Sequence, residues 1–420
     1  MPACALAALV AAGALAAPPP ASAGPAQATL QRFAASNPGT SALVWRLDEE
    51  GPVAVAAIRP DVPRIPASNM KMVTAAGALL QLGPDFRFTT RLATAARAPV
   101  VDGTLRGPLF VMGAGDPMLA TRAYGARYLR GVATPLADLV RPLPAAGIRR
   151  VAGPIVADEG LFDAMREGPR WLSHYHLYSQ PLSALAVNQG YAGNGRRAEA
   201  PVPWRAAAVR VRGALHGVRI AHEGGMRRGR PPASVRVLST ATSAPLRAIV
   251  REMNVPSDNF VAEMLTKAVG AHGSGRGTSA GGTARTEALL AARGVLTGRE
   301  RLVDGSGLSR DNRLTATALV RLVAAADADP DWGRALLASL PRGGEGTLAT
   351  RLRSPRVARR VQAKTGYING ASSLSGRVVS VGGQRYAFAM LMNTGGLADA
   401  RRTQEQVVTL LALGREDPQG

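Results

Sequence analysis

Apolar and polar positions alternate through the final part of the chain, a pattern that predicts consecutive strands. The expected strands are 359–368, 370–381 and 384–393. Elsewhere, apolar residues recur every three or four positions, which is typical of helices with one buried face. The expected helices are 66–82, 244–253, 260–269 and 400–414. The pattern therefore predicts a fold that contains both kinds of element, with the last helix packed on the sheet.

The region between about residues 90 and 240 has a different texture. Short strand-like runs are separated by Gly and Pro turns, and no repeat of fixed period is present. These runs are 90–95, 107–113, 153–158, 207–213 and 234–239. One helix is expected within 127–147. We therefore predict a mostly β region inserted into the chain.

The first 23 residues have the pattern of an export signal. An apolar run is followed by "PPPASA", which ends at Ala23 in an Ala-x-Ala cleavage pattern. The only cysteine, Cys4, lies inside this segment, so the mature chain is expected to have no disulfide, thiol nucleophile or cysteine metal site. No later apolar run is long enough to predict a membrane span.

Composition narrows the choice of partners. The chain has 420 residues, of which 46% are apolar, so it can bury a sizeable core. Its net charge of +22 favours anionic partners. Aromatic residues make up only 4% of the chain, and the arginines are scattered instead of interleaved with stacking side chains. We therefore expect no nucleic-acid binding.

Three lysines stand among 51 basic residues, and the others are arginine. A lysine can lose its proton near an active site, whereas an arginine cannot. Lys267, within "VAEMLTKAV", is interpreted as an ordinary residue on a helix surface. Lys71 and Lys364 lie in motifs that suggest chemistry.

The first motif is Ser68-x-x-Lys71, in "PASNMKMVTAAGALLQL". At this spacing, both side chains lie on one face of a helix, with the amine within reach of the hydroxyl. A neutral Lys71 can take the proton of Ser68 and create a nucleophile for acyl transfer. The alternative is that Ser68 caps the helix and Lys71 lies on its surface.

The second motif is "NVPSDNF", in a turn between two expected helices. Ser257 can relay a proton between Lys71 and a leaving amine, and Asn259 can bond Lys71 and a substrate amide. The alternative is an Asp/Asn turn that only caps the following helix.

The third motif is "AKTGY", on an expected edge strand. Lys364 and Thr365 would bind a substrate carboxylate, and Gly366 has no side chain to block the groove. The N–H groups of Tyr367 and Ser68 would stabilise an oxyanion. The alternative is a turn before a surface strand.

Other candidates are weaker. Residues 113–117, "GAGDP", are interpreted as a turn and not as a nucleotide loop. His174 and His176 could face one side of a strand, but no acidic partner is evident, so no metal site is expected. Asp158 could reach from the inserted region toward the cleft and pair with a free amine of a peptide substrate, although surface solvation is the competing interpretation.

The three motifs in this order are the set found in serine β-lactamases and penicillin-binding proteins. With segments such as "SALVWRLD", "GAGDPML", "LSALAVNQG" and "VDGSGLSRDNRLT", the chain resembles the low-molecular-mass class C penicillin-binding proteins, a family of D-alanyl-D-alanine carboxypeptidases and endopeptidases. The resemblance covers most of residues 30 to 410. Tyr367 departs from it, since a smaller residue is expected there, and its side chain could narrow the groove.

The resemblance implies an α/β (α+β) fold with a five-stranded antiparallel sheet flanked by helices. Residues 24–90 and 240–420 would form the catalytic domain, and residues 91–239 a mostly β insert. It implies cleavage of peptidoglycan stem peptides through a Ser68 acyl-enzyme, without a cofactor, in the periplasm or at the cell wall. β-Lactam antibiotics would bind Ser68 covalently. A β-lactamase or esterase of the same fold, and a non-catalytic peptidoglycan-binding protein, stay open as alternatives.

Overall fold

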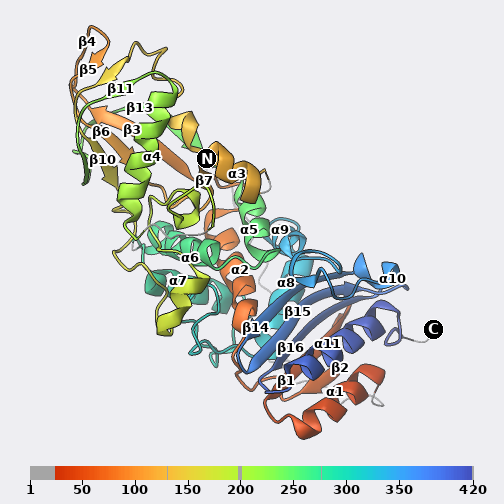
Figure 1. Ribbon diagram of the computed structural model, residues 1–420. Coiled ribbons are helices and arrows are strands. Elements are labelled where there is room, and N and C mark those ends of the chain that lie inside the picture. Colours follow the sequence, from red (N-terminus) through yellow and green to blue (C-terminus); the bar gives the residue numbers. More distant parts are fainter. Residues whose placement is uncertain (1–23, 130, 197–200, 276, 419–420) are drawn as a thin grey trace, which may run out of the picture.

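The computed structural model describes residues 24–129, 131–196, 201–275 and 277–418. The predicted export signal at 1–23 lies outside the described residues. The chain forms an elongated molecule: one large sheet and its helices lie at one end, and smaller sheets lie at the other (Figure 1). Helices α2 (Met70–Leu82), α5 (Leu246–Asn254) and α6 (Asn259–Ser274) lie between these ends.

The large sheet has five antiparallel strands, as the resemblance implied. Their spatial order is β14 (Val361–Ile368), β15 (Ala371–Val379), β16 (Arg385–Met392), β1 (Thr40–Asp48) and β2 (Gly51–Ile58). The three strands predicted in the final part of the chain are confirmed, and β14, which carries Lys364, is an edge strand. An edge strand leaves half of its backbone groups free to bond other partners.

Helices cover both faces of this sheet. Helices α1 (Pro25–Ser36) and α11 (Leu397–Ala412) pack on one face, which confirms the predicted C-terminal helix. Helix α8 (Ala316–Ala328) packs on the other face and contacts α9 (Trp332–Ser339). Helix α9 in turn contacts α2, which also packs on α7 (Ser279–Ala291). Successive strand residues point to opposite faces, so Val44 lies in the core under α11 while Leu43 lies in the core that contains α2.

The inserted region contains two adjoining sheets of short strands and one further pair. One sheet has the order β12 (Met226–Arg228), β10 (Ile155–Asp158), β6 (Leu109–Met112), β3 (Thr89–Ala95) and β13 (Val235–Thr242). The other has the order β11 (Ala221–His222), β9 (Arg150–Val151), β5 (Thr104–Leu105) and β4 (Val100–Val101). The remaining pair is β7 (Leu119–Ala120) with β8 (Thr134–Pro135).

Glycines stand where the chain passes from one of these sheets to the other. Gly107 follows β5, Gly153 follows β9 and Gly224 follows β11, and each precedes the neighbouring strand of the second sheet. A Cβ on Gly153 would collide with the Gly107 carbonyl, and a Cβ on Gly224 with that of Gly153. The three backbones are therefore stacked too closely at this bend for any side chain.

Two predictions within the insert were wrong. Residues 207–213 are not a strand but part of helix α4 (Pro203–Gly217), because Ala207, Val211 and Leu215 form a buried helical stripe. The alternation of valine and arginine in this segment matches the period of a strand, which led to the wrong prediction. The predicted helix within 127–147 is also absent from the described residues there: helix α3 (Arg122–Tyr128) ends at its start, and only a 3₁₀ turn at Leu136–Leu139 follows β8.

The remaining predicted strands of the insert are confirmed by β3, β6, β10 and β13. In the pairing of β3 with β13, Thr89 lies opposite Thr242 at one end and Ala95 lies opposite Val235 at the other. The boundaries predicted between the catalytic domain and the insert, at residues 90 and 240, remain a prediction. Among the described residues, no helix is long and apolar enough to cross a membrane.

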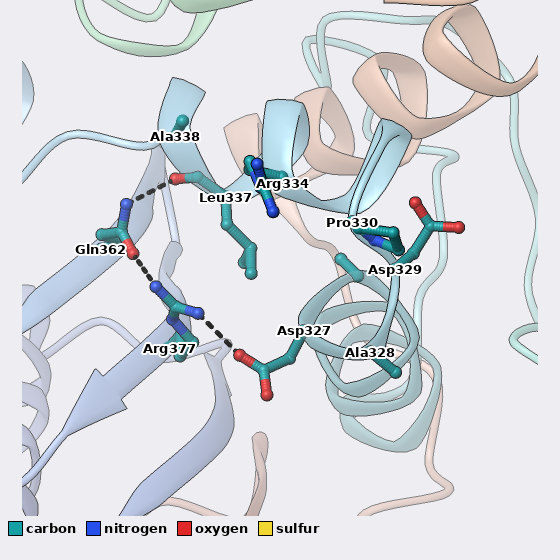
Figure 2. A pocket seen from close by; sticks show the side chains of 10 residues that line it. Asp327, Ala328, Asp329, Pro330, Arg334, Leu337, Ala338, Gln362 and Arg377 are labelled. Atoms are coloured by element: carbon teal, nitrogen blue, oxygen red, sulfur yellow. Dashed lines mark hydrogen bonds and ion pairs between the residues drawn. The ribbon is translucent and has the colours of Figure 1, made fainter. Parts of the chain in front are cut away.

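Polar bonds fix the start of β14 against the helices. Figure 2 shows a hollow at this end of the strand, where Gln362 donates to the carbonyl of Leu337 in α9 and accepts from Arg377. Arg377 continues to the nearly buried carboxylate of Asp327 in α8. Gln362 precedes Lys364 by two residues, so this network positions the strand face that carries the lysine.

Candidate active site

Ser68 lies in a strained turn at the start of α2. It belongs to the 3₁₀ turn Ala67–Asn69. The preceding Ala67 has a φ of 47°, a value that residues other than glycine rarely adopt. The Ser68 Oγ lies 3.1 Å from the Nζ of Lys71. Asn69 occupies the cap position of α2 and makes no capping bond. Ser68 is therefore not an ordinary cap, and its hydroxyl faces the lysine.

Lys71 is completely buried and bonded on three sides. Besides Ser68, its Nζ donates to Asn259 Oδ1 and to the Ser306 carbonyl, each at 2.7 Å. Burial lowers the pKa of Lys71 from 10.5 to about 8, although the charges of Asp304 and Glu263 raise it. The amine can thus be neutral close to physiological pH, as a general base must be.

Asn259 joins the second motif to the first. The preceding Asp258 caps α6 by accepting from the N–H of Val261, so the capping interpretation is correct for this residue. The Asn259 amide has a separate use: its Oδ1 accepts from Lys71, and its Nδ2 donates to the carbonyl of Tyr178 at 2.9 Å. Tyr178 belongs to the insert, which therefore contributes to the site.

Ser257 and Lys364 meet across the cleft. Ser257 has a φ of 64°, a left-handed conformation unusual for serine. Its Oγ accepts from the Lys364 Nζ at 2.9 Å, and the same amine donates to the Thr365 carbonyl at 2.8 Å. Lys364 is completely buried, and burial, reinforced by the charge of Lys71, lowers its pKa well below the ordinary value.

Gly366 brings β14 against the start of α2. A Cβ at this position would lie 2.7 Å from the carbonyl of Pro66 and 3.1 Å from the amide nitrogen of Ser68, and would collide with Ser373 Oγ. Only glycine allows this approach. The Ala363 N–H donates to the Pro341 carbonyl, away from β15. Since backbone direction repeats every two residues, the N–H of Tyr367 faces the same free edge.

Tyr367 lines the cleft, and its ring also contacts helix α11 on the far face of the strand. Gly366 faces α2, so the next side chain along the strand points to the opposite face. There, the guanidinium of Arg401 in α11 lies 4.7 Å from the centroid of the ring, a cation–π contact. The ring is 57% exposed. The strand alternation therefore explains why a large side chain is tolerated beside the groove.

Thr365 makes a bond that the sequence did not predict: its Oγ1 donates to Thr347 Oγ1 at 2.7 Å. Neither Thr365 nor Lys364 lines the open cleft, which has a volume of about 870 Å³. The lining residues are Ser68, Leu172, His174, Tyr175, Tyr178, Ser257, Asn259, Leu308, Arg310, Tyr367, Ile368 and Asn369. The nucleophile candidate thus opens into a groove with one aromatic wall from the insert.

Asp158 lies elsewhere. It ends β10 and lines a different hollow, beside Phe86 and Arg230, and its Oδ1 accepts from the N–H of Gly160. The prediction that it reaches the cleft finds no support in this position. His174 and His176 belong to a 3₁₀ helix (Ser173–Tyr178) and not to a strand. In the described part of the chain, no group of three or more His, Cys, Asp or Glu could hold a metal.

The interpretation of Lys267 was wrong. This residue is completely buried and not on the surface, and its Nζ donates to Asp163 and to the Met165 carbonyl. Burial lowers its pKa, and Asp163 opposes that effect. A lysine that appeared ordinary therefore ties α6 to the insert. Residues 113–117 form the predicted turn between β6 and β7, where Gly115 has a φ of 77°.

Several site residues were missed by sequence reasoning. They are Glu263, Asp304, Ser306, Arg310 and the insert residues Trp171 and Tyr178. Trp171 donates to the Asp304 carboxylate at 2.8 Å. The one available signal was periodicity: Asn259, Glu263 and Lys267 are four residues apart, so these polar groups lie on one face of a helix that is otherwise apolar.

A strained serine beside a buried lysine, at the junction of an antiparallel sheet and a helical region, is typical of the serine acyl-transfer enzymes that include the penicillin-binding proteins. The chain belongs to the D-Ala-D-Ala carboxypeptidase 3 (S13) family, whose model matches residues 44–202 and 203–413. It is thus a serine-type D-Ala-D-Ala carboxypeptidase of the class C low-molecular-mass penicillin-binding proteins, and the resemblance stated from the motifs is confirmed.

Two curated relatives are similar over most of the chain. A D-alanyl-D-alanine carboxypeptidase from an Actinomadura species is 31% identical, and the match covers 85% of this chain and 78% of the relative. A carboxypeptidase from Mycobacterium tuberculosis is 30% identical, over 84% of this chain and 76% of the relative.

Solved structures share the fold. The crystal structure of penicillin-binding protein 4 from Haemophilus influenzae matches with a TM-score of 0.77 at 22% identity, covering 90% of this chain and 97% of that one. The same protein has been solved in complex with a β-lactam, with a TM-score of 0.71 at 22% identity, over 91% of this chain and 99% of that one. These similarities confirm the five-stranded sheet with an additional β region.

Proposed function

We propose that this carboxypeptidase acts on the D-alanyl-D-alanine part of peptidoglycan stem peptides through an acyl-enzyme on Ser68. The observation that carries the proposal is the position of the Lys71 amine. It lies 3.1 Å from Ser68 Oγ, in a site where burial brings its pKa to about 8. A neutral amine at that distance can accept the hydroxyl proton as the oxygen attacks.

Acylation begins with neutral Lys71 taking the Ser68 proton. The Oγ then bonds the carbonyl carbon between the two D-alanines, and the oxygen of that carbonyl becomes an anion between the N–H groups of Ser68 and Tyr367. The proximity of Gly366 to the Ser68 nitrogen supports this pairing. Collapse of the intermediate breaks the C–N bond and leaves the peptide carbonyl on Ser68.

The leaving amine must gain a proton as this bond breaks. Ser257 gives its hydroxyl proton to the amine and recovers one from Lys71, so the lysine returns to its neutral form. Water then attacks the acyl-enzyme, with Lys71 again as the base, and frees Ser68. Asn259 holds the Lys71 amine and can bond the substrate amide.

The terminal carboxylate of the substrate binds at Lys364, with Thr365 beside it. Lys364 is buried and, in the described structure, bonded only to neutral oxygen atoms, so an arriving carboxylate would supply the missing opposite charge. A β-lactam presents a similar amide and carboxylate. We therefore expect it to acylate Ser68 and leave slowly. The Haemophilus relative has been solved in complex with a β-lactam, which is consistent with binding of this class of compound.

Intact-mass measurement after penicillin treatment tests the proposal. The wild type should gain the mass of one penicillin, and Ser68→Ala should gain none. An unmodified wild type, or an adduct that survives in Ser68→Ala, would refute the Ser68 acyl-enzyme. Rapid turnover of a chromogenic β-lactam would instead favour the β-lactamase alternative, and peptidoglycan binding without cleavage would favour the non-catalytic one.

Digestion of purified muropeptides tests the substrate. Release of D-alanine from monomers reports carboxypeptidase activity, and loss of cross-linked dimers reports endopeptidase activity. We expect D-alanine release at the least. An exported location, periplasmic or at the cell wall, follows from this substrate and from the expected signal at 1–23, and fractionation of cells that express the full chain would check it.

A further inference from the structure

The bonds of Lys71 raise the question of what directs its lone pair. A neutral amine has two N–H groups and one lone pair. The carbonyl of Ser306 can only accept a hydrogen bond, and Asn259 presents its oxygen to Lys71 because its nitrogen donates to Tyr178. These two oxygens therefore take both N–H groups. The lone pair is left facing the third contact, the hydroxyl of Ser68.

The Ser306 carbonyl is thus as necessary as Asn259 for orienting the Lys71 lone pair. The loop that carries this carbonyl is held in place by a buried acid. Glu263 Oε1 accepts from the backbone N–H groups of Gly305 at 3.1 Å and Ser306 at 2.8 Å. On the other side of the loop, Thr74 Oγ1 donates to the Gly305 carbonyl at 2.7 Å. The peptide between Gly305 and Ser306 is held between α6 and α2.

Glu263 is completely buried, and its second oxygen makes no hydrogen bond of good geometry within the described structure, although the Ser306 side chain lies close enough to oppose the rise of the Glu263 pKa. A carboxylate oxygen without a good hydrogen bond in the interior lowers the stability of the fold. Stability alone therefore does not explain a glutamate at this position. Its neighbours along the helix face are Asn259, which contacts Lys71, and Lys267. A group placed this way serves the Lys71 site more directly than it serves packing.

We propose that Glu263 is a positioning residue for Lys71: through Oε1 it fixes the loop whose Ser306 carbonyl directs the lysine lone pair at Ser68, and its charge sets the pH range in which the lysine acts as a base. This inference rests on the proposed function, in which Lys71 is the general base.

The charges around Glu263 support the second half of the proposal. The charged groups that interact with it are Lys71 from α2, Lys267 from α6 and Asp304 from the loop after residue 303. Burial and the charge of Asp304 raise the pKa of Glu263 to about 7. Its charge in turn raises the pKa of Lys71. Two groups that interact in this way titrate as a coupled pair near neutral pH.

The test measures the rate of Ser68 acylation by penicillin across pH in the full-length chain. Glu263→Gln keeps an oxygen of the same reach and removes the charge. We expect its acylation rate at high pH, where the rate no longer changes, to stay within about 3-fold of the wild-type rate. The pH range in which the rate rises (the acidic limb of the profile) should move to lower pH, because Lys71 loses a neighbour that raises its pKa. Glu263→Ala loses the anchor, and its rate should fall about 100-fold across the pH range.

Two further variants separate positioning from charge. Glu263→Asp keeps the charge but shortens the reach, so we expect a lower plateau with an unshifted acidic limb. Glu300→Gln is the matched control: Glu300 is also a buried carboxylate, bonded to Thr297 and Thr315 and not to the Lys71 cluster. It should leave both the plateau and the limb as in the wild type, even if its melting temperature falls.

The outcomes decide between the proposals. If the wild type is acylated and Ser68→Ala is not, but Glu263→Gln has the wild-type limb, the inference on Glu263 is wrong while the proposed function stands. Failure of the wild type to acylate would reject the proposed function itself. If Glu263→Ala does not fold, the limb of Glu263→Gln still decides.

Discussion

A buried lysine lies behind each side of the cleft, and the two lysines have opposite surroundings. On the helical side, Lys71 is bonded by an amide oxygen, a carbonyl and a hydroxyl, and the charges of Asp304 and Glu263 lie close enough to raise its pKa. On the strand side, Lys364 is bonded by a hydroxyl and a carbonyl. There, Lys71 is the only charge among the described residues that contributes to the pKa shift, and it lowers the pKa of Lys364 further.

We infer from this difference that the two lysines have different functions. The Lys71 site is complete without substrate, because its acceptors orient the amine and nearby acids moderate the cost of burial. The Lys364 site lacks an anion among the described residues, so its cationic form is stabilised only when one arrives. A base has to be ready before the substrate binds, whereas a carboxylate receptor has to be left unsatisfied until then. The two lysines are thus not interchangeable, although both are buried.

The largest expected effect is on the helical side. Lys71→Met should lower the acylation rate by about 10³- to 10⁴-fold, because no base remains beside Ser68. In the wild type, the rate should rise with pH, with a midpoint of about 8, since only the neutral amine accepts a proton. Stopped-flow acylation by penicillin between pH 5 and 10 measures both. A pH-independent wild-type rate would contradict the assignment of the base.

The same pKa has a consequence for stability. The pKa of Lys71 in the folded state lies below its ordinary value of 10.5, so the unfolded chain binds more protons between about pH 8 and 10.5. The contribution of Lys71 to the free energy of unfolding therefore rises with pH across that window.

The next effect is on the strand side. Lys364→Arg keeps the charge but should lose about 100-fold in acylation, because a planar guanidinium does not fit where the compact ammonium contacts Ser257 and the Thr365 carbonyl. Intact-mass measurement at short times gives the rate. A variant that acylates as fast as the wild type would show that any cation suffices there.

A backbone change should have a comparable effect without altering any charge. Gly366→Ala would force β14 away from Ser68 and Pro66, so we expect about 100-fold slower acylation. Gly213→Ala is the matched control, because nothing lies within 4 Å of a Cβ at Gly213 in helix α4. That control should keep its rate and gain slightly in stability. Equal rates for both variants would show that the approach of β14 does not matter.

The smallest effect is expected at Tyr367. Because its ring points toward Arg401, Tyr367→Leu should change the acylation rate less than about 2-fold, while the melting temperature falls slightly with the lost cation–π contact. Arg401→Ala should lower the melting temperature similarly. A large loss of rate in Tyr367→Leu alone would place the ring in the substrate groove.

The sequence predicted one side of this comparison better than the other. The strands of the large sheet and its edge were readable because alternation is a local property, and the order of the three motifs indicated the peptidase family. The hydrogen-bond partners of Lys71 were harder to predict. The Ser306 carbonyl lies 235 positions away in the sequence, and every residue has a backbone carbonyl, so residue types do not reveal this bond. Of the three groups bonded to Lys71, only Ser68 and Asn259 were predicted from the sequence.

The failures have physical causes. Val209 and Val211 alternate with arginines as in a strand, but Val211 and Leu215 are also one helical turn apart, and packing decided for α4. Lys267 appeared to be a surface residue because its partner, Asp163, is supplied by the insert. The direction of the Tyr367 ring followed from the strand period, once Gly366 was known to face α2.

The central claim is that Lys364 receives a carboxylate whereas Lys71 acts as the base. The most direct test compares acylation by a penicillin with acylation by its methyl ester, in the wild type and in Lys364→Met. We predict that the wild type prefers the free carboxylate by roughly 10- to 100-fold, and that Lys364→Met loses this preference while it still reacts slowly with both. A preference that survives unchanged in Lys364→Met would contradict the account.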